Sequence, residues 1–346
     1  MFGDASIPTQ LTREYGLRHP FVSAGMGFVA YERLAAAVAE AGGLGMLGAT
    51  PDPPESLEVM VGRLRAVTTG AWGVDLIHAQ TGLGPACHDG HIEACARLRV
   101  PLVVFHHDLP SAEWVRRLVA AGARVWMQVS SVELAVGALQ LGVHGLVAQG
   151  SEAGGHARGT VPLLALLDQV RRRAGDVLLL AAGGISDGAA VAAALRAGAD
   201  GVWVGTRMVA AEEAYAHREY QARLVASPGA TVRTTKFGPE WPDQPYRLLA
   251  TAFAQGQPAP PTEQGAEAPI GHTRLFPHSA NVPYGMPPYC ALPPTPDTAG
   301  NWDLMAYPAG QGVGAVRAVA PAADIIAEMM AEAAAELARP LTQPGR

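Results

Sequence analysis

Short apolar runs alternate with amphipathic segments along the chain between residues 20 and 206. The apolar runs have the length of β-strands and carry apolar residues at successive positions, which is typical of parallel strands buried on both faces. Eight runs fit this description and are predicted as strands: residues 21–26, 44–49, 72–77, 102–107, 124–129, 145–149, 177–182 and 201–206.

The amphipathic segments between these runs predict helices. Glycine marks many of their ends, and Ser, Asp or Pro marks many of their starts, as helix caps and breakers do. The predicted helices cover residues 31–41, 55–66, 91–98, 112–121, 132–141, 161–173 and 188–197. Eight strands in such an α/β series indicate a (β/α)8 TIM barrel rather than an open doubly wound sheet.

The pattern changes after about residue 211. Residues 212–253 appear helical and then irregular, and residues 256–300 are rich in Pro, Gly and polar groups, too long a stretch for an ordinary connection. An alanine-rich amphipathic helix is predicted at 321–337. We therefore expect a barrel of residues 1–213 plus 301–346, with a smaller, partly helical cap of residues 214–300 inserted after strand eight. The apolar face of the last helix could cover either the barrel or a second copy of the chain in a homodimer.

Charge and cysteine content narrow the class of protein. The 346 residues carry a formal net charge of −6, and no block of Lys or Arg suggests a nucleic-acid partner. Three cysteines leave at least one unpaired, which argues against a disulfide framework and for a reducing compartment. The N-terminus lacks a secretory pattern and no apolar run has membrane-spanning length, so we expect a cytoplasmic protein without a membrane partner.

The most informative stretch is VAQGSEAGGHARGT at residues 147–160, which begins as a strand and becomes a glycine-rich loop. Polar side chains just past the carboxyl end of a buried strand are where such barrels keep their chemistry. His156 could act as a base or a hydrogen-bond donor, or could be a structural histidine. Glu152 could be a second catalytic group or could orient the loop backbone. We predict that this loop belongs to the active site.

A second glycine-rich region, residues 181–206, contains the ends of the last two predicted strands. Gly183 and Gly184 end strand seven, and Gly205 and Thr206 end strand eight. Backbone N–H groups at these two loops form the usual phosphate cradle of a (β/α)8 barrel. The alternative is that these glycines only allow tight turns. The paired placement favours a phosphorylated cofactor or substrate.

Other candidate residues stand at the remaining strand ends. Small residues at 23–27, SAGMG, suit main-chain contact with a planar ring. Further titratable side chains on the expected rim are Asp75, His78, His106, His107 and Asp108. The CHDGHIEAC stretch places Cys87, His91 and Cys95 at helical spacing, but this spacing matches no standard zinc module, and we expect no metal site.

Together these motifs resemble the nitronate monooxygenase (2-nitropropane dioxygenase) family. The resemblance rests on SAGMG, AQGSEAGGH at 148–156, AAGGI at 181–185 and GVWVGT at 201–206. Weaker matches are FGPEWPDQPYR at 237–247 and YPAGQGVG at 307–314, so that the matches span almost the whole chain in order.

This resemblance implies a barrel that binds FMN non-covalently, with His156 as the catalytic histidine facing flavin and substrate. Asp75 stands where family members often carry Asn, and a carboxylate there would alter the electrostatics of the flavin or need a partner. The implied FMN-binding residues are Ala24, Gly25, Met26, Asp75, Gln149, Gly154, Gly155, Gly183, Gly184, Gly205 and Thr206.

The reaction that the resemblance implies is oxidation of an alkyl nitronate, or of a nitroalkane, by O2 to a carbonyl compound and nitrite. Protonated His156 would also attract the nitronate anion. One rival is a flavin-dependent enoyl-thioester (acyl-carrier-protein) reductase that uses NAD(P)H, because such enzymes share the EAGGH loop. Another is a flavin-free phosphate-binding lyase or isomerase, although no lysine follows a strand. A non-catalytic flavin sensor would leave the open histidine unexplained.

Overall fold

The predicted eight strands form one parallel barrel. The computed structural model describes residues 6–50, 52–82, 84–257 and 268–340. The strand order around the sheet is β1-β11-β10-β8-β7-β6-β3-β2. Hydrogen bonds from Ser23 N to Leu44 O (3.1 Å) and from Leu44 N to Phe21 O (2.9 Å) join the first and last strands and close the sheet. The barrel strands are β1 (Phe21–Ser23), β2 (Gly45–Gly48), β3 (Trp72–His78), β6 (Leu102–His107), β7 (Arg124–Val129), β8 (Gly145–Gln149), β10 (Leu178–Ala182) and β11 (Gly201–Val204).

Side chains fill the barrel interior at the amino-terminal ends of the strands. Trp126 and Trp203 are buried there among smaller apolar side chains. The short helix α1 (Gln10–Tyr15) closes this end, where Leu11 is buried and the Tyr15 ring lies edge-on to Trp126 at 5.2 Å. Because the amino-terminal end is filled, an open cavity has room only at the carboxyl ends of the strands.

The helices around the barrel agree with the predicted positions to within a few residues. They are α2 (Glu32–Glu40), α3 (Pro54–Val67), α4 (Asp89–Arg97), α5 (Ala112–Ala120), α6 (Val132–Gln140), α7 (Leu163–Ala174) and α8 (Gly188–Arg196). Two predicted strands are too long: β1 ends at Ser23 rather than at residue 26, and β11 ends at Val204. After β1 the chain turns, with Met26 N bonded to Ala24 O, and Thr206 already begins the short helix α9 (Thr206–Val209).

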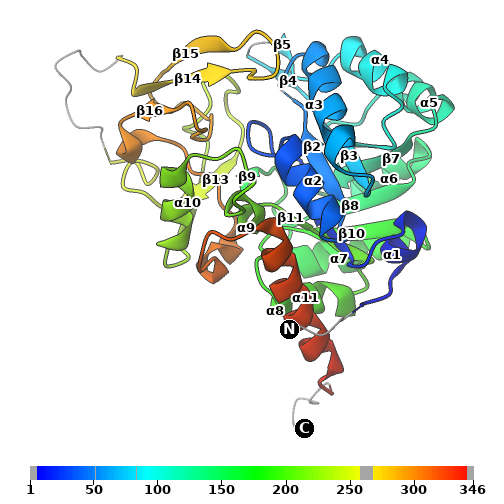
Figure 1. Ribbon diagram of the computed structural model, residues 1–346. Helices are drawn as coiled ribbons and strands as arrows, with labels where there is room; N and C mark the ends of the chain where they lie inside the picture. The colour runs from blue at the N-terminus through cyan, green and yellow to red at the C-terminus, as the bar shows by residue number, and fades with distance from the viewer. Residues whose placement is uncertain (1–5, 51, 83, 258–267, 341–346) are drawn as a thin grey trace.

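The last helix, α11 (Ala322–Ala338), lies beside α8 and α2 and covers the barrel (Figure 1). Its apolar residues Ile325, Ile326, Met329 and Met330 are buried within this chain. Gly188 at the start of α8 lets α8 and α11 approach closely, since a Cβ there would lie 2.2 Å from Glu332 Cβ. The apolar face of this helix therefore covers the barrel of its own chain, the first of the two predicted alternatives. A homodimer stays a prediction.

The segment between α9 and α11 consists mostly of loops and turns with short strands and helices. It contains α10 (Arg218–Val225), β12 (Thr231–Thr234), β13 (Tyr246–Leu249), β14 (Gly271–Leu275), β15 (Val282–Met286), β16 (Ala299–Gly300) and two 3-10 helices, Trp302–Leu304 and Gln311–Ala315. Residues 258–267 of the predicted Pro-rich stretch lie outside the described residues, as do residues 1–5, 51, 83 and 341–346. The division into a barrel and a cap stays a prediction.

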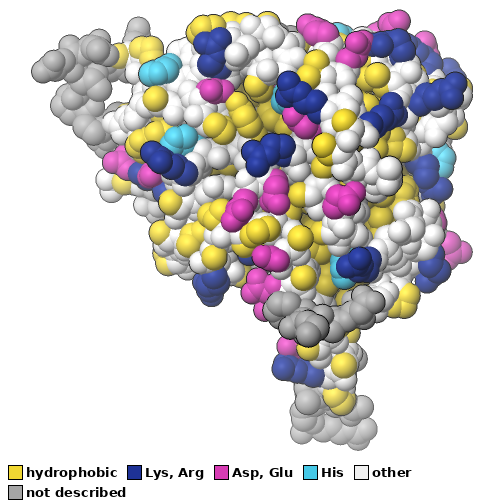
Figure 2. Space-filling model, in the orientation of Figure 1, with side chains coloured by type: hydrophobic (Ala, Val, Ile, Leu, Met, Phe, Trp, Pro, Cys, Tyr) yellow, Lys and Arg dark blue, Asp and Glu magenta, His cyan; other side chains and the backbone are white. Residues whose placement is uncertain are grey.

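One small sheet connects this segment with a barrel loop. Strand β13 pairs with β12 on one side and with β9 (Gly155–His156) on the other, which joins the 214–300 segment to the loop after β8. A further hairpin, β4 (Gln80–Thr81) and β5 (Gly84–Pro85), follows β3. Basic and acidic side chains are interspersed over the face shown in Figure 2. Among the described residues no helix is long and apolar enough to cross a membrane.

Candidate active site

A cavity of about 490 Å³ opens at the carboxyl ends of the barrel strands. All of the catalytic and FMN-binding residues that the family resemblance implies line it: His156, Ala24, Gly25, Met26, Asp75, Gln149, Gly154, Gly155, Gly183, Gly184, Gly205 and Thr206. They come from five strand ends, which the barrel brings to one rim. The structure thus places these residues together, and their individual roles stay predictions.

One end of the cavity offers backbone donors. The N–H groups of Gly183, Gly184 and Gly205 donate no hydrogen bond to any other described residue. Gly183 and Gly184 have φ values of +112° and +72°, which favour glycine and turn these amides away from the strand ladder. The Thr206 hydroxyl accepts a hydrogen bond from Gly310 N (3.0 Å) and keeps its own proton to donate. Such a group of free donors fits a phosphate.

The loop from Ala24 to Gly27 forms another wall of the cavity, with small residues at three of its four positions and Met26 as the one long side chain. Gly25 must be glycine because a Cβ there would lie 2.2 Å from Asp75 Cβ. A Cβ at Gly205 would meet only Ala24 Cβ and the Met26 sulfur, at 3.7 and 3.8 Å. This wall of small residues leaves room for a planar ring such as a flavin, and it adjoins the free donors.

The loop after β8 is held from both sides. Both carboxylate oxygens of Glu152 accept a hydrogen bond from Leu163 N (3.0 Å), at the first residue of α7. Arg247 donates to Ser151 O (2.9 Å), and Arg233 donates to Ala157 O (2.8 Å). Glu152 therefore caps a helix and orients the loop, the second of the alternatives considered from the sequence.

Replacing Glu152 with alanine is expected to lower the free energy of unfolding by about 1–2 kcal/mol, because the carboxylate satisfies a helix N-terminus. Flavin affinity should fall as well, since the loop contributes Gly154 and Gly155 to the cavity. Urea unfolding and flavin titration measure the two effects. Ser111→Ala is the matched control: Ser111 caps α5 through Trp114 N (3.1 Å) but does not line the cavity, so it should cost stability only. Equal flavin affinity in Glu152→Ala and Ser111→Ala would contradict the orienting role.

His156 is positioned by aromatic rings from residues 240–246. Its backbone pairs with Tyr246, the two rings stack at 4.1 Å, and the Trp241 ring lies at 4.7 Å. Burial lowers the pKa of His156 to about 4, and the Pro245 carbonyl offsets only part of this effect. The imidazole is therefore neutral at pH 7. Desolvation thus favours the neutral imidazole over the protonated form that was expected to attract an anion, and the role of His156 stays a prediction.

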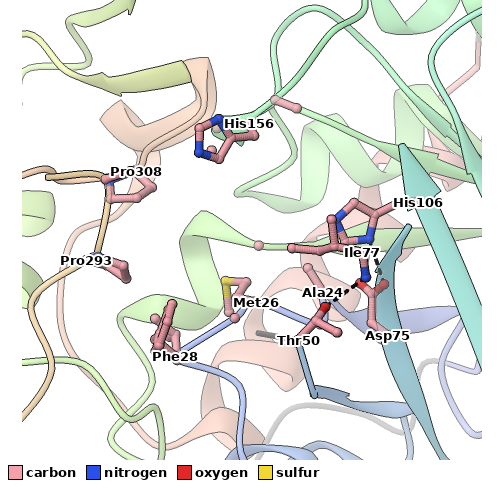
Figure 3. Close-up of a pocket in the computed structure, with 18 of the residues that line it drawn as sticks. Ala24, Met26, Phe28, Thr50, Asp75, Ile77, His106, His156, Pro293 and Pro308 are labelled. Atoms are coloured by element: carbon pink, nitrogen blue, oxygen red, sulfur yellow. Dashed lines mark hydrogen bonds and ion pairs between the residues drawn. The ribbon is translucent and has the colours of Figure 1, made fainter. Parts of the chain in front are cut away.

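Asp75 has a partner that the sequence did not assign. His106 Nδ1 and Asp75 Oδ1 lie 2.8 Å apart, with the two side chains 13% and 4% exposed. Strands β3 and β6 pair in parallel, with Asp75 opposite Val104 and Ile77 opposite His106. The histidine therefore lies two positions nearer to the carboxyl ends of the strands than the aspartate. Figure 3 shows this pair on one wall of the cavity and His156 on another.

The other polar residues predicted for the rim, His78, Asp108 and His107, differ in whether they reach the cavity. His78 lies outside the cavity lining with Nδ1 3.1 Å from Asp108 O, and Asp108 forms an ion pair with Arg158 (2.6 Å). His107 lines the cavity beside Trp241, and burial holds its pKa well below the usual range. No Lys or Arg is among the described residues that line the cavity.

Sequence reasoning missed several lining residues of the 214–300 segment and of the strand ends. FGPEWPDQPYR was the available signal for three of them, but only as a motif without a role. The missed residues include Trp241, Tyr246, Tyr284, Glu240, Gln128 and Thr50.

The CHDGHIEAC stretch is structural. Helix α4 begins at Asp89, His88 caps it through Gly90 N (3.2 Å), and His91 Nε2 lies 3.0 Å from Asp52 O. Cys87 and Cys95 are buried as free thiols. No group of three or more potential metal ligands occurs in the described parts of the chain.

A (β/α)8 barrel whose rim joins free phosphate donors to a wall of small residues and a histidine fits the class of flavin-dependent oxidoreductases. The family model described as nitronate monooxygenase matches residues 9–332, and the chain belongs to this family.

Curated relatives carry two different names. Nitronate monooxygenase from Pseudomonas aeruginosa is 29% identical over 363 residues, covering 92% of this chain and 97% of that protein. The (3aS,4S,5R,7aS)-5-hydroxy-7a-methyl-1-oxo-octahydro-1H-indene-4-carboxyl-CoA dehydrogenase from Mycobacterium tuberculosis is 32% identical over 251 residues, covering 72% of this chain and 68% of that protein. The family thus contains more than one activity.

Solved structures extend the likeness to the whole fold. FabK from Thermotoga maritima superposes with a TM-score of 0.76 at 28% identity, covering 96% of this chain and 98% of that one. Nitroalkane oxidase from Streptomyces ansochromogenes superposes with a TM-score of 0.74 at 29% identity, covering 94% and 98%.

Proposed function

We propose that this protein is an FMN-dependent nitronate monooxygenase that oxidises alkyl nitronates with O2 to carbonyl compounds and nitrite. The observation that carries the proposal is a single cavity in which free phosphate donors, a wall of small residues and a neutral histidine meet. The names of the Pseudomonas relative and of the Streptomyces structure support the nitronate or nitroalkane substrate.

The cofactor form that this cavity fits best is FMN. The donors of Gly183, Gly184, Gly205 and Thr206 make a cradle for one phosphate group, and the wall at 24–27 adjoins it. The redox chemistry would come from FMN when it is bound, since the protein's part in such enzymes is to bind, orient and tune charge.

In this proposal the chain's own residues bind the substrate and exclude water. Neutral His156 donates a hydrogen bond to a nitro oxygen, and the Gln149 amide offers a second polar contact. Trp241 and Tyr246 cover the histidine and keep water from it. A low-dielectric pocket strengthens these hydrogen bonds to an oxygen that carries negative charge.

The second candidate is a flavin-dependent reductase or dehydrogenase of thioesters, such as an enoyl-thioester reductase using NAD(P)H. The relative named as a carboxyl-CoA dehydrogenase favours it. The flavin-free lyase or isomerase has less support: the chain's lysine, Lys236, does not line the cavity.

Oxygen uptake by the FMN-loaded protein on alkyl nitronates, in the absence of NAD(P)H, tests the proposal. We expect rapid uptake with release of nitrite. Flavin that stays bound without any uptake, together with NAD(P)H consumption on an enoyl thioester, would reject the monooxygenase in favour of the second candidate.

A further inference from the structure

A second histidine faces the same cavity from a different wall. His106 stands on β6 and lines the cavity together with Asp75 from β3, whereas His156 belongs to the loop after β8 (Figure 3). The proposed oxidation of a nitronate does not use His106. A buried carboxylate and imidazole in contact beside a substrate cavity need an explanation of their own.

The contact with Asp75 determines which ring nitrogen is free. Because a carboxylate only accepts, His106 Nδ1 carries the hydrogen that binds Asp75 Oδ1 at 2.8 Å. Nε2 of the neutral ring then holds a lone pair, and no other described residue makes a hydrogen bond to it. A carboxylate at Nδ1 holds the imidazole in this tautomer and stabilises the imidazolium that forms when Nε2 takes up a proton.

The pair is held firmly. Asp75 packs directly on the main chain at Gly25, where no side chain would fit. Thr50 Oγ1 accepts a hydrogen bond from Ile77 N (2.8 Å), two residues beyond Asp75 on the same strand end. Such support keeps a catalytic group within the small angular range that proton transfer needs.

The other histidines of the cavity lack this arrangement. Burial lowers the pKa of His156 to about 4, and it lowers the pKa of His107 well below the usual value, so both are weak proton acceptors. Neither forms a hydrogen bond with a carboxylate among the described residues. Glu240, the other carboxylate of the lining besides Asp75, is occupied by the Tyr284 hydroxyl at 2.8 Å.

We propose that His106 is the catalytic base that removes the α-proton from a neutral nitroalkane, with Asp75 as its positioning residue. This inference rests on the proposed function and assigns a base for nitroalkanes, the neutral substrates that the family resemblance already implies. In this step the Cα–H proton moves to His106 Nε2. The C–H electron pair forms the C=N bond of the nitronate, and an N=O π pair moves onto oxygen. Nothing is oxidised or reduced.

The test measures proton abstraction apart from oxidation. FMN-loaded protein is incubated with nitroethane in D2O without O2, and loss of the α-hydrogen signal is followed by proton NMR. Preformed ethyl nitronate is oxidised in a parallel assay with O2. We expect His106→Gln to lower the enzyme-dependent exchange at least about 100-fold. Its oxidation of ethyl nitronate should stay within about 5-fold of that of the unchanged protein, because the nitronate no longer needs a base.

Two further variants separate chemistry from folding. Asp75→Asn keeps the size of the side chain and should lower exchange by roughly 10-fold or more, with an altered pH profile. His78→Gln, on the neighbouring strand end but outside the cavity, should leave exchange and oxidation unchanged. The visible flavin spectrum reports whether each variant retains a formed cavity.

The outcomes distinguish this inference from the proposed function. Oxidation of nitronate without exchange of nitroethane would overturn the role of His106 and leave the monooxygenase standing. Exchange that depends on His106 without nitronate oxidation would support the base and reject the monooxygenase. Equal exchange in His106→Gln and the unchanged protein, or selective loss in His156→Asn, would also overturn the assignment.

Discussion

Replacing Gly183 with valine is expected to leave the purified protein without flavin and reduce its oxidase activity to the background rate. The φ of +112° at this position is unfavourable for a β-branched residue, and a Cβ would lie 3.1 Å from Ala153 N and 3.2 Å from Gly150 O. Relaxing these contacts requires the 183–184 turn to move, and its two free amides would leave the cradle. Flavin affinity should fall at least about 100-fold, which corresponds to two such hydrogen bonds to a charged phosphate.

Gly198→Val is the control for this experiment. Gly198 also has a positive φ, +91°, but it follows α8, its Cβ would meet no atom within 4 Å, and it does not line the cavity. Both variants therefore carry similar backbone strain, of about 1–2 kcal/mol. The measurements are the flavin-to-protein ratio after purification and FMN titration of the stripped protein. Stoichiometric flavin in Gly183→Val would show that these amides do not hold the phosphate.

The barrel could be predicted because its signals are local. Each strand is a short apolar run between Gly, Ser or Pro positions, and burial on both faces leaves no alternation that might mislead. The errors in the predicted strand ends occur where residues face the cavity and are not packed in the core. Residues 24–26 and Gly205 are small and apolar like the strands before them, but they lie past the strand ends and form the cavity wall. Composition alone does not separate a buried position from one that faces a ligand.

The candidate site was predictable only where its residues lie at the end of a predicted strand or directly follow it. The glycines of residues 149–156 and 183–184 stand next to their own strands. Trp241 and Tyr246 reach the cavity because β13 pairs with β9, a contact between distant parts of the sequence that no local pattern encodes. The bond between Asp75 and His106 likewise depends on the register of β3 against β6. Pairing register is set by the closed barrel as a whole.

Replacing His156 with asparagine is expected to lower kcat/KM for alkyl nitronates by about 10²–10³-fold while leaving flavin bound, as loss of one hydrogen-bond donor to developing charge does. The phosphate donors lie on other loops and are untouched. Because burial lowers the pKa of His156 to about 4, the neutral donor is present above that pH. The difference between the two proteins should therefore be constant from pH 8 to about 5 and should change only as the pH falls through 4, where the imidazole gains a charge but still donates.

His144→Asn is the matched control, because His144 and His156 flank the same strand at opposite ends. His144 precedes β8, accepts a hydrogen bond from Val125 N (3.0 Å) at the amino-terminal side of the barrel and does not line the cavity. Its loss should affect stability but not kcat/KM. A pH profile in which the effect of His156→Asn changes near pH 6.5 would instead indicate an imidazole that titrates as in water, and with it a cavity far wetter than the stacked rings of Trp241 and Tyr246 allow.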